Sequence, residues 1–322
     1  MQKKLLAGYG SAFVDIVINV SAEELEQAAP GVPCGTVRPV SKLEQQELLE
    51  HFAPERRQRS VGGSCANTLR HFALEAQDDA PSSTVRLIAP IGTDDNGEFF
   101  AEQVAKIPNF QFCPIVIDGA ATNCCVALVT PDGERTMFPL LEAEQRVRAE
   151  QLTAEMLRGA QWLHIEGYTL RYPEIWERLM LLAAKSHIAY SVDAADCSIA
   201  TAHRTELLDT RSKYFRWLFA NEAEAKALCG NDYIRDWPDK RAVVITLGAR
   251  GAFAVSKNFK CGAPALKVEK VVDTVGAGDS FIAGFLHSWI RRSPVMEEDL
   301  SVVKGLAMGC ACAAKCIQHA GA

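Results

Sequence analysis

The chain has 322 residues, of which 48% are hydrophobic and 23% are charged, a composition that supports a folded core and excludes a disordered chain. Its formal net charge of −6, with lysines and arginines scattered along the sequence, excludes the basic surface that nucleic acid binding requires. We also expect no membrane span, because no window approaches the roughly 20 apolar residues of a membrane helix.

The N-terminal segment predicts a cytoplasmic protein. Gly8, Gly10 and Ser11 dilute its apolar run and Asp15 ends it, which is not typical of a secretory signal peptide. No linker rich in glycine, serine or proline separates two compositions in this sequence. We therefore expect residues 1–322 to form a single domain.

The eleven cysteines are expected to be reduced and mostly buried, because their spacing is irregular and many lie in apolar segments. Cys310, Cys312 and Cys316 lie close together in a helical pattern. Offsets of two and six residues point in different directions on a helix, so we expect no metal site there.

Strand-like and helix-like segments alternate along nearly the whole chain, which is typical of a parallel sheet with helices on both faces. The predicted strands, in chain order, are residues 5–18, 85–92, 162–168, 188–194, 217–221 and 242–248. Apolar residues at offsets of three and four predict helices at residues 67–76, 98–107, 173–186 and 222–230. The predicted fold class is α/β.

A second group of segments interrupts this alternation and predicts antiparallel strands. The group comprises residues 110–119 and 122–141, with a hairpin turn at residues 131–134, and also residues 17–19 and 35–40. We expect a small sheet built from strands within residues 14–40 and 110–140. It forms either a lid over an active site or an extension of the main sheet, and the sequence leaves both open.

Residues 273–280, DTVGAGDS, predict an anion-binding turn. They follow a strand-like alternation at residues 265–272 and precede a helical pattern. Gly276 and Gly278 allow backbone N–H groups to converge, and the positive end of the following helix favours an anion. A phosphate group fits this turn.

Asp279 is unexpected beside such a turn, because a fixed carboxylate repels a bound phosphate. One interpretation is a plain helix N-cap, a role that aspartate fills well. The other is a general base that takes a proton from a hydroxyl attacking the phosphorus, while the glycine amides stabilise the transferred group. The motif alone leaves both open.

Residues 61–74 contain a second glycine turn. Gly62 and Gly63 expose backbone, Ser64 is suited to cap the helix that follows, and Asn67 lies in its first turn. An amide that both donates and accepts hydrogen bonds suits a ligand with several hydroxyls. A bare helix cap is the alternative.

Asn221 and Glu224 have the spacing of a capping box directly after a predicted strand. An acid at the carboxyl end of a parallel strand is also placed to order the water shell of Mg²⁺, an ion that gives up its waters reluctantly. Gly248 and Gly251 interrupt the next strand-like segment, which predicts either a hairpin or a close approach of a nucleotide.

Two other nucleotide-binding motifs are poorly matched. No G-x-x-x-x-G-K-[ST] string occurs in the sequence. The dinucleotide pattern that begins at Gly8 has Phe13 in its third glycine position. A nicotinamide-dependent oxidoreductase is therefore weakly supported.

In their order and spacing, these motifs resemble those of the ribokinase-like (pfkB) family of sugar and nucleoside kinases. GGSCAN at residues 62–67 is similar to that family's first signature, and DTVGAGDSFIAGF at residues 273–285 is similar to its second. NEAE at residues 221–224 looks like its N-x-x-E element, and TLGARG at residues 246–251 looks like its nucleotide-site strand. The resemblance covers roughly residues 5–322 and implies a Rossmann-like three-layer α/β/α (ribokinase-like) fold with a small β-sheet lid.

The resemblance also implies the reaction, which is the phosphorylation of a primary hydroxyl by ATP and Mg²⁺. Asp279 would be the catalytic base, and the amides of Ala277, Gly278 and Asp279, in the turn that begins at Gly276, would form the anion hole. The residues implied at the acceptor are Asp15, Gly62, Gly63, Ser64, Asn67 and Tyr168. Those implied at the nucleotide are Asn221, Glu224, Thr246, Gly248, Gly251, Thr274 and Arg135.

Some parts of this assignment stay open. Glu224 would organise Mg²⁺ through water, while a monovalent cation and the choice between monomer and homodimer are undecided. For Arg135, a solvated hairpin arginine is the alternative to a phosphate contact.

The resemblance is stronger to the adenosine-kinase branch than to ribokinase or fructokinase, but two positions depart from that branch. Tyr168 is followed by Thr169 where the branch typically has a second aromatic ring, and stacking on one ring is worth about 1 kcal/mol. Glu142 stands where related sequences often have glycine. The predicted acceptor is therefore a sugar or a ribonucleoside, with adenosine itself in doubt. A non-catalytic small-molecule sensor of the same fold is the alternative function.

Overall fold

The computed structural model describes residues 4–75, 83–209, 211–235, 237, 242–292, 297–319 and 321. Its main sheet has nine strands in the order β13-β12-β11-β10-β9-β8-β1-β4-β5. They are β1 Lys4–Tyr9, β4 Ser83–Gly92, β5 Phe110–Ile117, β8 Trp162–Ile165, β9 Ala189–Asp193, β10 Phe215–Asn221, β11 Val243–Thr246, β12 Ala252–Val255 and β13 Lys260–Ala263. The pairs from β5 through β11 are parallel, whereas β11-β12 and β12-β13 are antiparallel.

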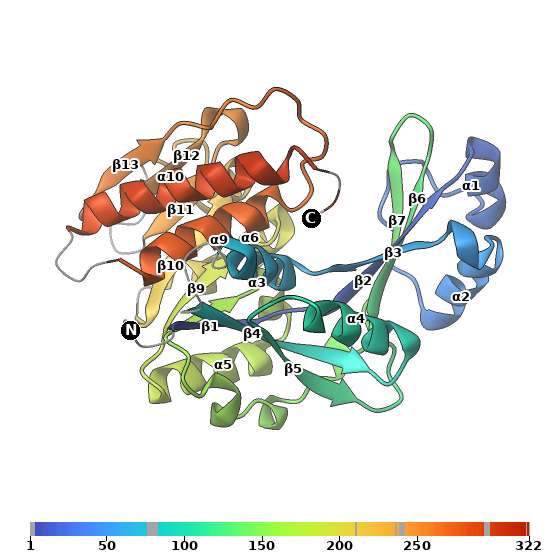
Figure 1. Ribbon diagram of the computed structural model, residues 1–322, viewed down its shortest axis with the longest axis horizontal. Coiled ribbons are helices and arrows are strands. Elements are labelled where there is room, and N and C mark those ends of the chain that lie inside the picture. Colours follow the sequence, from blue (N-terminus) through green and yellow to red (C-terminus); the bar gives the residue numbers. More distant parts are fainter. Residues whose placement is uncertain are drawn as a thin grey trace.

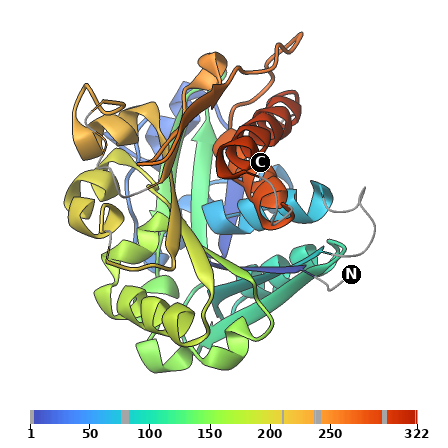
Figure 2. The same cartoon turned by 90° about the vertical axis from the view of Figure 1, so that its left-hand side faces the viewer.

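Helices cover both faces of this sheet and give three layers (Figure 2). Successive strand residues such as Leu6 and Ala7 enter two different apolar clusters, as strand geometry requires. One face packs on α3 Ser64–Glu75, α4 Asp95–Ala105, α9 Ala277–Ile290 and α10 Glu298–Cys316. The other packs on α5 Pro173–Lys185, α6 Cys197–Ala202, α7 Arg204–Leu207 and α8 Glu222–Cys229.

A separate sheet of four strands stands beside the main sheet, together with two helices (Figure 1). Its order is β3-β2-β6-β7, with β3 Gln58–Gly62, β2 Phe13–Asn19, β6 Asn123–Val129 and β7 Arg135–Leu140, and its helices are α1 Ala22–Ala28 and α2 Lys42–Glu50. β1 continues directly into β2, so this small sheet lies beyond the carboxyl ends of the parallel strands. Ligands bind at that edge in open α/β sheets.

Short 3₁₀ helices make up the remaining regular structure of the described residues. They are η1 Pro54–Arg56, η2 Glu144–Arg146, η3 Ala149–Gln151, η4 Ala154–Leu157, η5 Gly167–Arg171 and η6 Gly248–Arg250. None of the helices in the described ranges has both the length and the apolar character that crossing a membrane demands.

The structure corrects the predicted single strand at residues 5–18. The segment forms two strands, β1 in the main sheet and β2 in the small sheet, joined by residues 10–12. A Cβ atom on Gly10 would lie 2.6 Å from both Cys65 Cβ and Glu166 Oε2. The glycine that weakened the apolar run therefore marks the place where the chain leaves the main sheet.

The predicted membership of the small sheet was wrong in two places. Residues 110–119 supply β5, which pairs in parallel with β4 at the edge of the main sheet, and Phe112 packs against Phe100 with ring centroids 5.3 Å apart. Residues 35–40 form only an isolated bridge, between Val37 and Met137, and the fourth strand of the small sheet is β3, which pairs with β2. In addition, β2 and β6 are parallel rather than antiparallel.

Residues 265–272, predicted as a strand, belong to no strand. Leu266, Val271 and Val272 are each about half exposed, at 53%, 53% and 49%. Their alternation predicted a buried face, but no neighbouring strand covers it. The anion-binding turn therefore follows an extended loop rather than a strand.

Candidate active site

The site forms where the first turns of α3 and α9 meet. Gly276 is the N-cap residue of α9 with φ of 75°, a left-handed conformation that suits glycine. Asp279 is the third residue of the helix rather than its cap. Its carboxylate accepts hydrogen bonds from Ser64 Oγ at 2.7 Å and Asn67 Nδ2 at 3.3 Å. The plain N-cap interpretation of Asp279 is therefore excluded.

The start of α9 presents amides suited to an anion. The Ala277 amide donates to the Thr274 carbonyl at 3.3 Å, so it is already engaged within the turn. The amides of Gly278 and Asp279 come next, and the first amides of a helix lack partners within the helix. Gly278 is exposed, and a Cβ atom placed on it would meet nothing within 4 Å. An anion can therefore approach this end of the helix.

The carboxyl group of Asp279 has an unusual acidity. Burial raises the pKa of Asp279 to about 7, and the charge of Asp193 adds to the rise. The hydrogen bonds from Ser64 and Asn67 and the charge of Arg70 act in the opposite direction. A carboxyl group with a pKa near neutrality is well matched to general base catalysis.

Apart from Tyr168, the acceptor residues predicted from the sequence gather where β2 and β3 pair and α3 begins. Asp15 lies on β2, and burial raises its pKa to about 6 against the charge of Arg135. A Cβ atom on Gly62 would lie 2.3 Å from Asp15 Oδ2, so this glycine leaves the space that the carboxylate fills. Gly63, with φ of 100°, then leads directly into Ser64 and Asn67.

A cavity of about 200 Å³ joins Asp279 to the predicted nucleotide residues. The predicted residues that line it are Ser64, Asn221, Glu224, Thr246, Gly278 and Asp279. They come from four separate segments of the chain, which the carboxyl ends of β10 and β11 bring together with α3 and α9.

Asn221 and Glu224 form the capping box of α8 and also line this cavity. Glu224 Oε2 accepts from the Asn221 amide at 2.8 Å, and Asn221 Oδ1 accepts from the Glu224 amide at 2.9 Å. Burial raises the pKa of Glu224 to about 7. Among the described residues, no group of three or more acidic, histidine or cysteine side chains could hold a metal ion directly. The donor set therefore fits a hydrated Mg²⁺ and not a bare one.

Besides Arg135, three predicted nucleotide residues lie outside this cavity. Gly251 has a φ of 94° and its amide donates to the Gly248 carbonyl at 3.0 Å, so Gly251 serves the turn between β11 and β12. Gly248 and Thr274 do not line the cavity, although each lies within four residues in sequence of a residue that does. The hairpin interpretation therefore holds for Gly251.

Two further predicted residues make specific contacts elsewhere. Arg135 of β7 lies 3.5 Å from Asp273, so it reaches the loop that precedes the anion-binding turn. The Arg135 side chain is also 46% exposed, as the alternative of a solvated hairpin arginine expects. Tyr168 hydrogen-bonds Asp196, and the guanidinium of Arg171 lies 4.6 Å from the centroid of its ring.

Sequence reasoning missed Asp193. It is the last residue of β9, is 6% exposed, lines the same cavity, and accepts from the amides of Ala195 at 2.9 Å and Gly167 at 3.2 Å. An acid at the carboxyl end of a predicted parallel strand was the available signal, since the same reasoning selected Glu224. A buried cluster around Glu166 was also missed.

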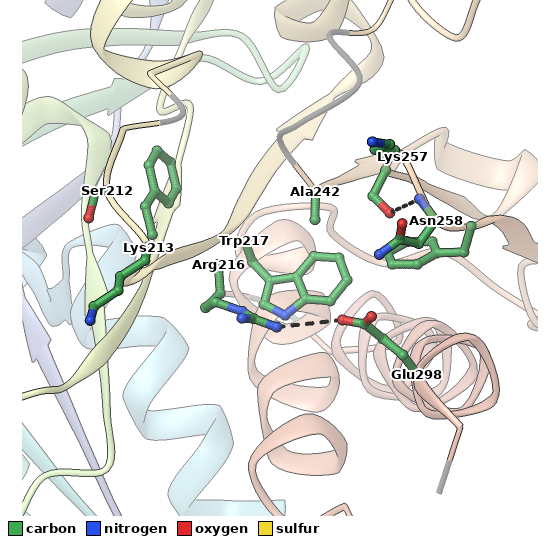
Figure 3. Close-up of a pocket in the computed structure, with 11 residues that line it drawn as sticks. Ser212, Lys213, Arg216, Trp217, Ala242, Lys257, Asn258 and Glu298 are labelled. Carbon is green, nitrogen blue, oxygen red and sulfur yellow. Dashed lines mark hydrogen bonds and ion pairs between the residues drawn. The ribbon is translucent and has the colours of Figure 1, made fainter.

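A second cavity, of about 320 Å³, lies away from this site (Figure 3). It is bordered by Lys213, Arg216, Trp217, Lys257, Asn258 and Glu298, with Arg216 and Glu298 paired at 3.5 Å. Phe215 lines it at the start of β10, whereas Asn221 at the end of β10 lines the first cavity. Seven strand residues span roughly 20 Å, so the two cavities are distinct.

Comparison with known proteins identifies the family. The model of the pfkB family of carbohydrate kinases matches residues 38–322, and the chain therefore belongs to this family. A fructokinase of Solanum tuberosum is 25% identical over 237 residues, which cover 70% of this chain and 72% of that protein.

Solved structures share the fold. A probable sugar kinase protein from Rhizobium etli CFN 42 superimposes with a TM-score of 0.81 at 23% identity, covering 100% of this chain and 95% of the other. An adenosine kinase from Sinorhizobium meliloti gives 0.80 at 24% identity, with the same coverage. The predicted α/β/α fold with a small second sheet is confirmed, and membership of the family supports a phosphotransferase that acts on sugars or nucleosides.

Proposed function

We propose that this protein transfers the γ-phosphoryl group of ATP to a primary hydroxyl of a sugar or ribonucleoside, with Asp279 as the general base. The observation that carries the proposal is the position of Asp279. Its carboxylate is held by Ser64 and Asn67 at the start of α9, beside the amides suited to an anion. A carboxylate there opposes phosphate binding unless it removes a proton from the attacking group.

In this mechanism the acceptor lies between the small sheet and α9. Asp15 and Asn67 hold its hydroxyls, and its primary hydroxyl gives a proton to the Asp279 carboxylate as the oxygen attacks the phosphorus. The amides of Gly278 and Asp279 stabilise the charge on the transferred group. Mg²⁺ would neutralise phosphate charge when bound, and Asn221 and Glu224 would hold its water shell.

The nucleotide would extend from the anion-binding turn past Thr246. The loop that leads into this turn exposes Leu266, Val271, Val272 and Val275 by 44% to 53%. Exposed aliphatic side chains of this kind suit the face of a purine base. Arg135 contacts the same loop from the small sheet through Asp273, which supports a role for this cation beside the phosphates.

Two contacts favour a sugar over adenosine as the acceptor. The Arg171 guanidinium already covers the Tyr168 ring, which was the predicted stacking platform for a purine. The carboxylate of Glu142 pairs with Arg146 and accepts from the Ala121 amide at 2.9 Å. A ribonucleoside is the second candidate, because the matched fold includes adenosine kinases.

The test is a coupled assay of ADP release over pentoses, hexoses and nucleosides, with Asp279→Asn as the blank. We expect turnover with a sugar that is absent in the blank. Tight binding of a ligand with MgATP but no transfer to it would instead support the sensor alternative. Binding of a nicotinamide cofactor, detected by fluorescence, would support the oxidoreductase alternative.

Ser64→Ala is expected to move the acid limb of the kcat/KM profile to higher pH. Activity requires the ionised Asp279 carboxylate, so kcat/KM of the wild type should fall as pH drops below about 7. The Ser64 hydrogen bond stabilises that ionised form, and its loss raises the pKa further. The measurement is kcat/KM against pH for both proteins. If the acid limb of Ser64→Ala lay at the same pH as that of the wild type, ionisation of Asp279 would not be what governs the acid limb.

A further inference from the structure

One buried polar cluster lies at the connections between the two sheets. In the described residues the chain passes between the sheets four times, at residues 10–12, 63, 118–122 and 141–143. The cluster contains Ser11, Asn123, Glu144 and Glu166, which are 4%, 0%, 8% and 3% exposed. The first connection contains Ser11, and the second lies two residues before Cys65, whose amide bonds to Glu166. The third ends directly before Asn123, and the fourth contains Glu142, whose amide bonds to Asn123.

Glu166 links two of these connections. It directly follows β8, and its Oε2 accepts from the amides of Ser11 at 3.3 Å and Cys65 at 3.1 Å. Ser11 lies between β1 and β2, and Cys65 is the second residue of α3. One carboxyl group therefore holds both the entry to the small sheet and the start of the helix that carries Ser64 and Asn67.

Glu144 links the other two. Its Oε2 accepts from Asn123 Nδ2 at 2.8 Å, and Asn123 Oδ1 accepts from the Glu142 amide at 3.2 Å. Asn123 is the first residue of β6, where the chain enters the small sheet, and Glu144 is the first residue of η2, just after the chain leaves it. The hydrogen bond between these two residues therefore connects the third and fourth passages.

Ser11 Oγ lies between the two acids, 2.6 Å from Glu144 Oε2 and 3.1 Å from Glu166 Oε1. A hydroxyl has one proton, so it can donate in only one of these contacts. Asn123 and Tyr172 also hydrogen-bond Glu144, which favours its ionised form, and its contact with Ser11 Oγ is the shorter of the two, so we assign the Ser11 proton to that contact. The remaining contact then needs a proton on Glu166 Oε1 that is donated to Ser11 Oγ. Every polar atom along this path is satisfied when Glu166 is a neutral acid.

We propose that Glu166 is a positioning residue that acts as a neutral acid, joining Ser11 to the start of α3 and thereby fixing Ser64 and Asn67 against Asp279. The role in catalysis rests on the proposed function, whereas the proton on Glu166 rests on the geometry alone. Ionised Glu166 would lose its hydrogen bond to Ser11 and face a second acid.

The electrostatic surroundings agree with a neutral Glu166. Burial raises its pKa to about 8, the charges of Glu144 and Asp193 add to the rise, and the amides of Cys65 and Ser11 oppose it. The titratable groups that face it from the packed elements are Tyr9 on β1, Cys65 on α3, Glu144 on η2, Tyr168 on η5 and Asp193 on β9.

The first test compares Glu166→Gln with Glu166→Ala in steady-state kinetics. The glutamine amide keeps an oxygen for the two backbone N–H groups and an N–H for Ser11 Oγ, so kcat and the acceptor KM should stay near the wild type at pH 7. Alanine removes all three bonds, and the KM should rise by about tenfold or more because the α3 residues shift. Ser11→Ala should raise the KM as well, and serves if Glu166→Ala does not fold.

The second test needs no catalysis. The unfolded chain releases the Glu166 proton near pH 4.3, whereas the folded protein keeps it to about pH 8. The free energy of unfolding of the wild type should therefore fall relative to Glu166→Gln as pH rises between those values. Glu102→Gln, an exposed acid on α4, is the matched control and should leave the pH dependence unchanged.

Each outcome decides one statement. If Glu166→Gln raised the acceptor KM as much as Glu166→Ala does, an ionised carboxylate would be required and the proposal would be overturned. A wild-type acceptor KM in both Glu166→Ala and Ser11→Ala would overturn the positioning role. If the free energies of unfolding of wild type and Glu166→Gln changed equally between pH 5 and 8, the assignment of Glu166 as a neutral acid would be overturned. If the wild type shows no phosphoryl transfer, the proposed function fails, and the unfolding experiment still decides the state of Glu166.

Discussion

Asp279→Asn should lower kcat/KM by about 10²- to 10⁴-fold, the usual contribution of a general base. Asparagine has nearly the same shape and keeps an oxygen for the hydrogen bond from Ser64 Oγ. It cannot accept the proton of an attacking hydroxyl, so the loss should appear in kcat rather than in the KM of the acceptor. The measurement is ADP release with the acceptor identified by the screen.

Asp95→Asn is the matched control for this substitution. Asp95 is an exposed acid in the first turn of α4, as Asp279 is in the first turn of α9, but it makes no contact with Ser64 or Asn67. Its activity should match the wild type. Equal activity of Asp279→Asn and wild type would show that the carboxylate serves folding alone, and the thermal unfolding midpoint would then be the property that changes.

Gly63→Ala should destabilise the fold by more than about 2 kcal/mol and abolish most activity. Gly63 has φ of 100°, and an added Cβ atom would lie 2.3 Å from the Ser11 carbonyl oxygen. That oxygen belongs to the backbone and cannot rotate away, so β3 or the linker at residues 10–12 must move. The measurement is urea unfolding together with kcat/KM.

Gly119→Ala separates the two causes. Gly119 also has a positive φ, of 69°, but an added Cβ atom would meet nothing within 4 Å. The free energy of unfolding of this variant should fall only by the cost of placing alanine at a positive φ, about 1 kcal/mol, and its activity should be unchanged. Equal losses in the two variants would mean that the close approach of Gly63 to Ser11 does not matter.

Local patterns predicted most of the main sheet and its helices, because alternating and helical periodicities report burial on one face. They do not report which strand lies alongside. Residues 5–18 therefore looked like one strand, and residues 110–119 were placed in the wrong sheet. Residues 265–272 show the opposite failure, since their alternating apolar residues remain exposed.

The site was predicted best where one short motif carries its own geometry. The turn before Asp279 could be described from the sequence as an anion-binding helix start, and α9 does begin there. The contacts of Asp279 with Ser64 and Asn67 span more than 200 residues of sequence, so no local pattern predicted them, and the family resemblance implied only that the three residues belong to one site. Glu144 lies in no such motif, and Glu166, an acid at the carboxyl end of a parallel strand, could not be told from the solvated acids that usually stand there.

The connection from β3 to α3 makes the basicity of Asp279 depend on the small sheet. Only Gly63 separates the last residue of β3 from Ser64, the first residue of α3 and a hydrogen-bond donor to Asp279. A displacement of the small sheet would therefore act through this one residue on the hydrogen bond that lowers the pKa of Asp279. The proton affinity of Asp279, which we propose as the base, would thus report whether the small sheet is in place before any substrate reacts.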